Sequence, residues 1–208
     1  EAFLHESQEA VYSQYAFAVY AIAVQTVGAT ARIAPARPAD AAEQPLGHDL
    51  AAMRSLVNER TRIVFIANPN NPTGTWIEAD ALTAFLDRVP QDVVIVLDEA
   101  YTEYVELAGF PNGMQLLSRY PNMIVTRTFS KIYGLAGLRI GYGVSSPELA
   151  SVIQRVRHPF NANLIALAAA EAALDDEQFL VQSRTVNSAG MQQLGAAFEA
   201  MGLVTIPS

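Results

Sequence analysis

The chain has 208 residues, of which 51% are hydrophobic and 16% are charged, and its formal net charge is −8. This composition provides enough apolar material for a globular core and argues against disorder. The 13 basic residues are outnumbered by 21 acidic ones, which argues against a nucleic-acid-binding surface. The absence of cysteine excludes disulfides and thiolate metal sites.

The most apolar stretches, near residues 17–24 and 164–174, are too short to span a bilayer. No segment has the features of a signal peptide. We therefore expect a soluble, cytoplasmic protein with no membrane partner. The chain starts at Glu1 rather than Met and stops at Ser208, shortly after an apolar run at 203–206 that is typical of a strand start. We expect it to be a fragment that lacks both termini.

The predicted elements alternate between helices and strands. The first three, in chain order, are a helix at Leu50–Val57 capped by Asp49, a strand at Arg62–Ala67, and a helix whose apolar residues recur from Ile77 to Val89. Strands follow at Val93–Leu97 and Met123–Val125. The last two elements are helices at Leu164–Leu174 and about Glu177–Met201. Because the strands are apolar throughout, we expect burial on both faces, as in parallel sheets. This alternation predicts an α/β fold. The Pro- and Ala-rich stretch Ala34–Gly47 is predicted to be a surface connection.

After Asn163 the sequence pattern is wholly helical. Ala, Leu and Phe recur at helical spacing, which predicts helices that leave the sheet for a second domain. We therefore predict a large domain over residues 1–174. Residues 175–208 are predicted to form a bridging helix and the start of a smaller C-terminal domain.

Asp98 directly follows the apolar strand Val93–Leu97. In open α/β sheets, ligands bind beyond the carboxyl ends of strands. Removing a carboxylate from water at the end of an apolar strand costs free energy unless a cation or a hydrogen-bond donor lies beside it. A protonated pyridine nitrogen would be such a partner, although Asp98 taken alone is equally typical of a helix cap or turn.

Asn71 lies in the turn Asn68–Gly74, whose prolines restrict the backbone and whose glycine admits positive φ. Such a turn can hold an amide rigidly against a ligand, but it can also be only a tight turn. Tyr101 comes three residues after Asp98. Together, Asn71 and Tyr101 could donate hydrogen bonds to a ring oxygen.

Lys131 follows a strand, with the hydroxyls of Thr128 and Ser130 just before it and Arg139 eight residues later. Its immediate neighbours are mainly apolar or aromatic, which favours a partly desolvated amine that can form a Schiff base. Arg139 can clamp a phosphate with two parallel hydrogen bonds. The alternatives are a solvated surface lysine and an arginine in a structural ion pair.

An amine, an acid, ring-oxygen donors and a phosphate cradle are the four parts that a pyridoxal 5'-phosphate site needs. The motifs that carry them are Asn-Pro-Asn-Asn-Pro-Thr-Gly-Thr at 68–75, Leu-Asp-Glu-Ala-Tyr at 97–101, Thr-Phe-Ser-Lys at 128–131 and Gly-Leu-Ala-Gly-Leu-Arg at 134–139. These motifs resemble those of the fold-type I pyridoxal-phosphate-dependent aminotransferases. Within that group, residues 11–20, 47–50 and 158–163 most resemble the histidinol-phosphate aminotransferases. The resemblance implies a three-layer, mostly parallel sheet flanked by helices.

The resemblance also implies a role for each site residue. Lys131 would bind the cofactor covalently and then move a proton between substrate and cofactor, and Asp98 would pair with the pyridinium nitrogen. Asn71 and Tyr101 would bind the ring oxygen, and the phosphate would be bound by Thr128, Ser130 and Arg139. Phe17 would stack on the ring, at a position where the family commonly has tyrosine. Asp98, Tyr101 and Lys131 would be the catalytic residues. Phe17 is nearly as typical of a helix core, and Tyr20 is a similar case with less support. We expect His48 to be a turn or surface residue.

The implied reaction transfers an amino group from glutamate to imidazole-acetol phosphate in L-histidine biosynthesis. The resemblance implies a homodimer whose partner supplies a tyrosine to the phosphate site. It also implies that the phosphate-binding glycine loop precedes Glu1 and that the carboxylate-binding arginine follows Ser208. Substrate recognition therefore lies largely outside this sequence.

Several alternatives keep the same cofactor residues. They are an aromatic or aspartate-like aminotransferase, a threonine-phosphate decarboxylase, a non-catalytic regulatory domain that binds the cofactor, and a structural relic without a ligand. A metal site is not expected, because His5, His48 and His158 lack paired ligand spacing. A Ser-His-Asp hydrolase is not expected either, because no Gly-x-Ser-x-Gly motif occurs.

Overall fold

The structure, a computed structural model, describes residues 1–208 and contains one six-stranded sheet. The strands are β1 (Glu9–Ser13), β2 (Thr30–Ala34), β3 (Thr61–Ala67), β4 (Val94–Asp98), β5 (Met123–Thr128) and β6 (Gly141–Ser145). Their order across the sheet is β2-β1-β3-β4-β5-β6. The first five strands run parallel, and β6 pairs antiparallel with β5. The prediction of a mostly parallel sheet is confirmed.

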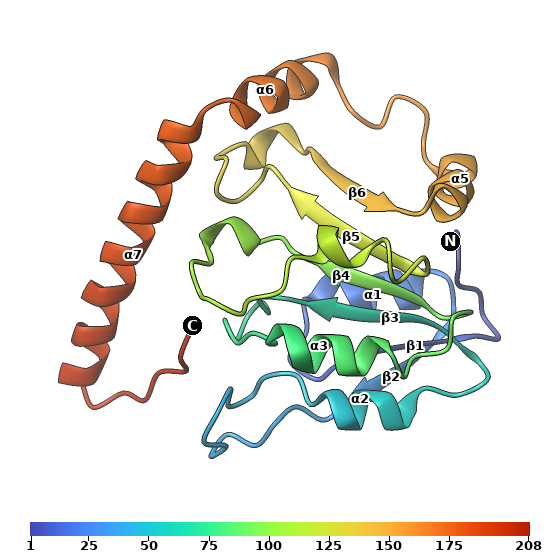
Figure 1. Ribbon diagram of the computed structural model, residues 1–208, viewed down its shortest axis with the longest axis horizontal. Coiled ribbons are helices and arrows are strands. Elements are labelled where there is room, and N and C mark those ends of the chain that lie inside the picture. The colour runs from blue at the N-terminus through green and yellow to red at the C-terminus, as the bar shows by residue number, and fades with distance from the viewer.

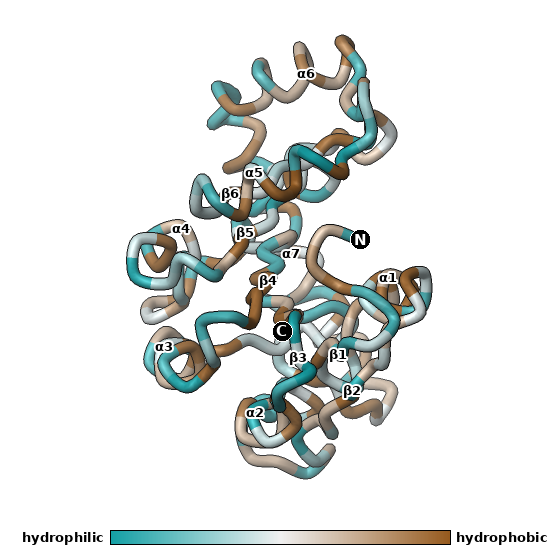
Figure 2. The backbone as a smooth tube through the Cα atoms, turned by 90° about the vertical axis from the view of Figure 1, so that its right-hand side faces the viewer, coloured by the Kyte–Doolittle hydropathy of each residue, from teal (hydrophilic) through white to brown (hydrophobic).

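Helices cover both faces of this sheet (Figures 1 and 2). The helices are α1 (Ala18–Thr26), α2 (Leu50–Leu56), α3 (Ala79–Leu86), α4 (Gly113–Leu116), α5 (Pro147–Val156), α6 (Leu164–Leu174) and α7 (Glu177–Ala200), with short 3-10 helices η1 (Thr102–Tyr104) and η2 (Ala136–Leu138). Side chains of α2, α3 and α4 pack on one face, and those of α1 and α5 pack on the other. The three-layer α/β architecture is therefore confirmed.

The apolar strand runs supply both layers of the core. In β3, Val64 and Ile66 face the α2 and α3 layer, whereas Ile63 and Ala67 face the α1 layer. Side chains of successive strand residues point to opposite faces, so a strand buried on both sides needs apolar residues at every position. This requirement explains why β3 and β4 read as continuous apolar runs.

Several local predictions can be compared directly with the structure. The side chain of Asp49 accepts a hydrogen bond from the backbone N–H of Ala52 at 2.9 Å, and this bond caps α2 as predicted. Ala34 ends β2, and the connection over residues 35–47 contains no helix or strand, as expected. Residues 203–206 form no strand, so the strand start expected there is wrong.

Helices α6 and α7 lie outside the layers that cover the sheet, and α7 runs alongside the molecule (Figure 1). One contact between α7 and the rest of the chain comes from Arg184, whose Nη1 donates to the carbonyl oxygen of Glu103 at 3.0 Å. Apolar side chains on both helices are exposed, among them Leu164, Ile165 and Val186. The helical prediction for this region is confirmed.

None of the helices combines the length and the hydrophobicity needed to cross a lipid bilayer.

Candidate functional site

The predicted site residues follow four neighbouring parallel strands. Ala67 at the end of β3 pairs in register with Asp98 of β4, and Asp98 pairs with Thr126 near the end of β5. Phe17 lies at the start of α1, directly after the turn that follows β1. Because the carboxyl ends of parallel strands meet at one edge, the segments that follow these strands converge there.

Two cavities at this edge contain all eight predicted site residues in their walls. Phe17, Asp98 and Lys131 line both of them. The smaller cavity adds Asn71 and Tyr101. The larger one has a volume of about 530 Å³, and it adds Thr128, Ser130 and Arg139. The structure therefore brings together residues that lie more than a hundred positions apart in the sequence.

The Asp98 carboxylate is held by two donors. Oδ2 accepts a hydrogen bond from the Tyr20 hydroxyl at 2.7 Å, and Oδ1 accepts one from the backbone N–H of Ala100 at 3.2 Å. Burial raises the pKa of Tyr20 well above its usual value, and the Asp98 charge raises it further. The hydroxyl is therefore protonated and donates. Sequence reasoning gave Tyr20 little weight, although its place three residues after Phe17 on one helix was a signal.

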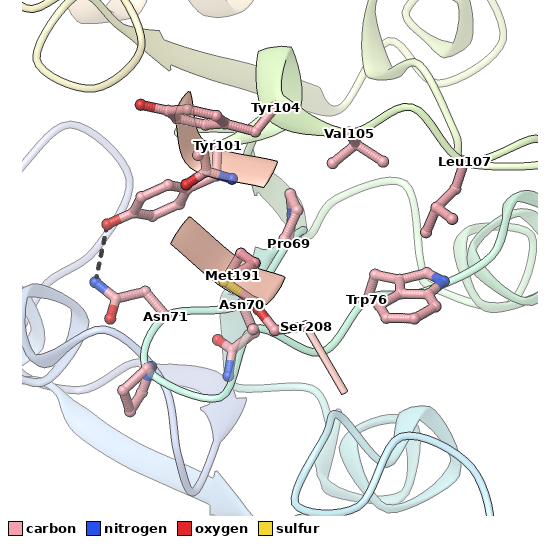
Figure 3. Close-up of a pocket in the computed structure, with 13 residues that line it drawn as sticks. Pro69, Asn70, Asn71, Trp76, Tyr101, Tyr104, Val105, Leu107, Met191 and Ser208 are labelled. Carbon is pink, nitrogen blue, oxygen red and sulfur yellow. Dashed lines mark hydrogen bonds between the residues drawn. The ribbon is translucent and has the colours of Figure 1, made fainter. Parts of the chain in front are cut away.

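The turn that carries Asn71 is held in place by hydrogen bonds from a side chain within it. The Asn68 side chain both donates to the Ile77 carbonyl and accepts from the Ile77 N–H, at 3.1 and 2.9 Å. Gly74 closes the turn with φ of 71°, a conformation that glycine adopts without strain. Asn71 Nδ2 lies 3.5 Å from the Tyr101 hydroxyl (Figure 3). The two predicted ring-oxygen donors are thus neighbours across the cavity.

Lys131 lies in the turn that follows β5. Its Nζ is 5.0 Å from the centroid of the Tyr101 ring. Phe129 and Ile132 on either side are buried, but Lys131 itself is exposed. The expectation of a partly desolvated amine is therefore wrong for this structure, because its neighbours turn into the core while the lysine points to the open edge.

The expected phosphate-binding residues form a small hydrogen-bonded group. Ser130 N–H donates to Thr128 Oγ1 at 3.0 Å, and Arg139 Nη1 donates to Ser130 Oγ at 3.2 Å and to the Ala136 carbonyl at 2.9 Å. Arg139 has φ of 56° in the left-handed region, which is uncommon for residues other than glycine. Its guanidinium meets a hydroxyl and a carbonyl rather than a carboxylate, which argues against the ion-pair alternative.

The structure argues against the alternative considered for Phe17 and changes the expectation for His48. Phe17 is 40% exposed and lines both cavities, so it does not belong to the helix core. His48 is buried, and its Nε2 lies 2.9 Å from the Ala67 carbonyl oxygen. Burial lowers the pKa of His48, partly offset by that hydrogen bond. The expectation that His48 is a surface residue is therefore wrong, because it packs behind the end of β3.

Glu99, the residue after Asp98, lies on the face of the sheet that α4 covers, opposite the face on which Asp98 contacts Tyr20 of α1. It is buried and accepts hydrogen bonds from the Gly113 N–H at 2.7 Å and from Arg127 Nε at 2.9 Å. Sequence reasoning did not identify this pair. It ties the segment after β4 to the end of β5, and both of these segments carry site residues.

A cavity of about 430 Å³ adjoins the site (Figure 3). Asn71 and Tyr101 form part of its wall, and Met191 of α7 forms another part. Tyr104 and Trp76 extend its aromatic lining beyond the predicted site. This side of the site is therefore enclosed in part by α7.

The donor set fits pyridoxal 5'-phosphate. The smaller cavity is lined by the Asp98 carboxylate and by Asn71 and Tyr101 as donors, and the larger one is lined by Arg139 with the neighbouring hydroxyls. The Lys131 amine borders both cavities. A cavity of about 530 Å³ is in the size range of small-molecule sites.

The sequence and the fold also match known proteins. The family described as aminotransferase class I and II matches residues 1–208. The chain belongs to the aminotransferase class I and II family. It is 56% identical over 207 residues to histidinol-phosphate aminotransferase 2 of Pseudomonas fluorescens strain Pf0-1, covering 100% of this chain and 54% of that relative. It is 58% identical over 200 residues to histidinol-phosphate aminotransferase 1 of Nitrosococcus oceani, covering 96% and 52%.

Solved structures of the aminotransferase family have the same architecture. Histidinol-phosphate aminotransferase from Sinorhizobium meliloti, in complex with pyridoxal-5'-phosphate, is similar with a TM-score of 0.89 and 32% identity, over 99% of this chain and 54% of that one. A tetra mutant of Thermus thermophilus aspartate aminotransferase shares the fold, with a TM-score of 0.87 and 21% identity over 100% and 58%. The chain spans about half the length of the curated relatives it matches.

Proposed function

We propose that the full-length protein is a pyridoxal 5'-phosphate-dependent aminotransferase that transfers an amino group between glutamate and imidazole-acetol phosphate in L-histidine biosynthesis. The observation that carries this proposal is the convergence of Lys131, Asp98, Asn71, Tyr101 and Arg139 around two adjoining cavities. The choice of substrate is supported by relatives 56% and 58% identical that are named histidinol-phosphate aminotransferases.

Lys131 and Asp98 would carry out the catalytic steps. Lys131 Nζ would hold the cofactor covalently and, once released, carry a proton to and from the substrate α-carbon. The Asp98 carboxylate would accept a hydrogen bond from the ring nitrogen and keep that nitrogen protonated. When bound, the cofactor supplies a ring that withdraws electrons from the substrate α-carbon.

The remaining residues would orient the cofactor. Asn71 and Tyr101 would donate to its ring oxygen, and Phe17 would stack on its ring face. Thr128, Ser130 and Arg139 would donate to its phosphate, with Arg139 adding a fixed positive charge. These roles are supported by the grouping of the ring-oxygen donors in the smaller cavity and of the phosphate-binding residues in the larger one.

The proposal extends to domains, assembly and compartment. We propose that residues 1–174 form a large cofactor-binding domain, and that residues 175–208 form a bridging helix and the start of a smaller domain. The long helix α7 begins at Glu177 and runs alongside the molecule, which supports a division just before it (Figure 1). We also propose a cytoplasmic homodimer on the basis of the family resemblance, and the exposed apolar side chains of Val19, Ile22 and Ile33 support a subunit interface. Analytical ultracentrifugation of the full-length protein tests the dimer.

The function is tested in two stages on the full-length protein. Its absorbance spectrum is recorded after adding pyridoxal 5'-phosphate, and the complex is then reduced with borohydride and mapped by mass spectrometry. A visible band and a label on Lys131 are expected, and the absence of both would refute the cofactor assignment. Initial rates are next compared for histidinol phosphate, phenylalanine and aspartate as amino donors to 2-oxoglutarate. A preference for phenylalanine or aspartate would replace the proposed substrate, and release of carbon dioxide from threonine phosphate would indicate the decarboxylase.

A further inference from the structure

Tyr20 is a buried residue of α1 whose position is fixed by aromatic contacts. Only 5% of it is exposed, and its ring stacks on Phe65 with centroids 4.8 Å apart and planes at 8°. Tyr12 and Phe17 contact it edge-on. The hydroxyl at the end of this ring donates to Asp98 Oδ2 at 2.7 Å. A ring held on three sides thus delivers a donor to one atom of the site.

We propose that Tyr20 is a positioning residue that orients the Asp98 carboxylate toward the ring nitrogen of the bound cofactor. This inference rests on the proposed function, because it requires pyridoxal 5'-phosphate in the site. Tyr20 is absent from the walls of both cavities, whereas Asp98 lines both. Tyr20 therefore acts through Asp98 and not by touching the cofactor.

The hydrogen-bond geometry at Asp98 supports this role. A carboxylate can accept about four hydrogen bonds through its two oxygens. Tyr20 occupies one position on Oδ2, and the Ala100 N–H occupies one on Oδ1. These donors come from different elements, so together they oppose rotation of the carboxylate. Acceptor capacity remains on both oxygens for a donor in the cavity.

The chemistry of the hydroxyl also suits the role. Burial and the neighbouring carboxylate raise the pKa of Tyr20, so its hydroxyl keeps its proton throughout the physiological range. A protonated hydroxyl donates to the carboxylate and does not compete with it for the proton of a pyridine nitrogen. Tyr20 thus favours the orientation of Asp98 that the site needs.

Tyr20 and Phe17 connect this role to the start of α1. Phe17, three residues earlier, lines both cavities, and its ring lies 6.0 Å from that of Tyr20 at 88°. Residues three apart on a helix lie on the same face. The start of α1 therefore places the Phe17 ring beside the face of the bound cofactor. It also places the Tyr20 hydroxyl beside Asp98, which holds the ring nitrogen of the cofactor.

The test removes the hydroxyl and keeps the ring. We expect Tyr20→Phe in the full-length protein to raise the dissociation constant for pyridoxal 5'-phosphate by about three- to tenfold, the value of one net hydrogen bond. We expect kcat to fall by a similar factor, with substrate KM changed by less than about twofold, because Tyr20 does not contact the substrate. Tyr12→Phe is the matched control, since Tyr12 is buried against Tyr20 and donates no hydrogen bond to Asp98. It is expected to stay within about twofold of the wild type in both quantities.

A double-mutant cycle separates positioning from a structural role. If Tyr20 acts through the carboxylate, adding Tyr20→Phe to Asp98→Asn changes cofactor affinity by less than about twofold. Equal losses in both backgrounds, accompanied by a lower melting temperature, would show a structural role and overturn the proposal. An unchanged cofactor affinity and kcat in Tyr20→Phe would overturn it as well.

Failure of this inference can be told apart from failure of the proposed function. If the wild-type full-length protein forms no lysine-linked absorbance band with pyridoxal 5'-phosphate, the proposed function fails and the inference fails with it. If the wild type forms that band and Tyr20→Phe matches it in affinity and kcat, only the role of Tyr20 is refuted.

Discussion

The amine of Lys131 lies 5.0 Å from the centroid of the Tyr101 ring. This contact joins the turn after β5 to the turn after β4, and it places the only lysine in the 208 residues beside a predicted ring-oxygen donor. A cation over an aromatic ring face is attracted by the ring electrons. The lysine is therefore held near the cavities while its amine stays accessible.

Replacing Lys131 tests the central assignment. Lys131→Ala is expected to remove the borohydride-dependent label and to lower kcat by at least about 10²- to 10⁴-fold, the contribution of a positioned general base. Single-turnover kinetics and mass spectrometry measure the two effects. Lys131→Arg keeps the positive charge but cannot form the covalent link, so it should lose the label as well. Wild-type turnover in either variant would refute the role of Lys131.

Replacing Arg139 tests the phosphate-binding end of the site. Arg139→Met is expected to raise the dissociation constant for pyridoxal 5'-phosphate by about 10- to 100-fold, because a hydrogen bond to a charged group contributes about 1.5–3 kcal/mol. Fluorescence titration measures this change. Arg155→Met on α5, which alters an exposed arginine, is the matched control and should leave affinity unchanged. Equal affinities of the two variants would contradict phosphate binding by Arg139.

The pair formed by Arg127 and Glu99 is predicted to stabilise the fold. Their side chains are 17% and 1% exposed, and Arg127 Nη2 lies 2.6 Å from Glu99 Oε2. Arg127→Met leaves a buried carboxylate without its partner, and such a loss costs about 3–5 kcal/mol of unfolding free energy. Urea denaturation measures it.

The control for this prediction is Arg119→Met. The ion pair between Arg119 and Asp87 is exposed, with side chains 59% and 44% accessible. Pairs of this kind contribute about 0–1 kcal/mol. If Arg127→Met were no more destabilising than Arg119→Met, the buried pair would have no special role in stability.

His48 predicts a pH dependence of stability. Burial lowers the pKa of His48 in the folded state below the ordinary value of 6.5. Below pH 6.5 the unfolded chain therefore binds a proton at His48 more readily than the folded chain does. The contribution of neutral His48 to the unfolding free energy is fully present above pH 6.5 and decreases as the pH falls, by up to about 1.4 kcal/mol per pH unit. His48→Gln should therefore lose less unfolding free energy between pH 7.5 and about pH 5 than the wild type does.

Urea denaturation at each pH provides the measurement, and His158→Gln, which changes an exposed imidazole, controls for the number of histidines. A pH slope in His48→Gln equal to the slope in His158→Gln would show that burial of His48 carries no penalty for protonation.

The sequence predicted the central strands and the site because both have strong local signals. The apolar run that ends in Asp98 and the Pro- and Gly-containing turn around Asn71 each mark a strand end by composition alone. The antiparallel strand β6 was not predicted, because Gly141–Ser145 lacks an apolar run and its pairing depends on β5. The short strand β2 is similarly weak, since most of its residues are not buried.

Contacts between distant segments could not be read from the sequence. Tyr20 meets Asp98 only because the sheet places β1 next to β3, and β3 next to β4. The burial of His48 likewise depends on the end of β3, 19 residues away. Residue types and spacing identified the chemical groups of the site, whereas tertiary packing determined which groups orient them.

Asp98 and Glu99 are consecutive acids that serve opposite layers, one beside Tyr20 and the other beside Gly113 and Arg127. Deleting or inserting one residue within β4 would exchange them, sending the arginine's partner toward the cavities and the cavity-facing acid into the interior. The number of residues in this strand is therefore more constrained than the choice between aliphatic side chains of similar volume, such as isoleucine and leucine. Natural variation in this part of the protein should exchange such side chains but almost never change the spacing.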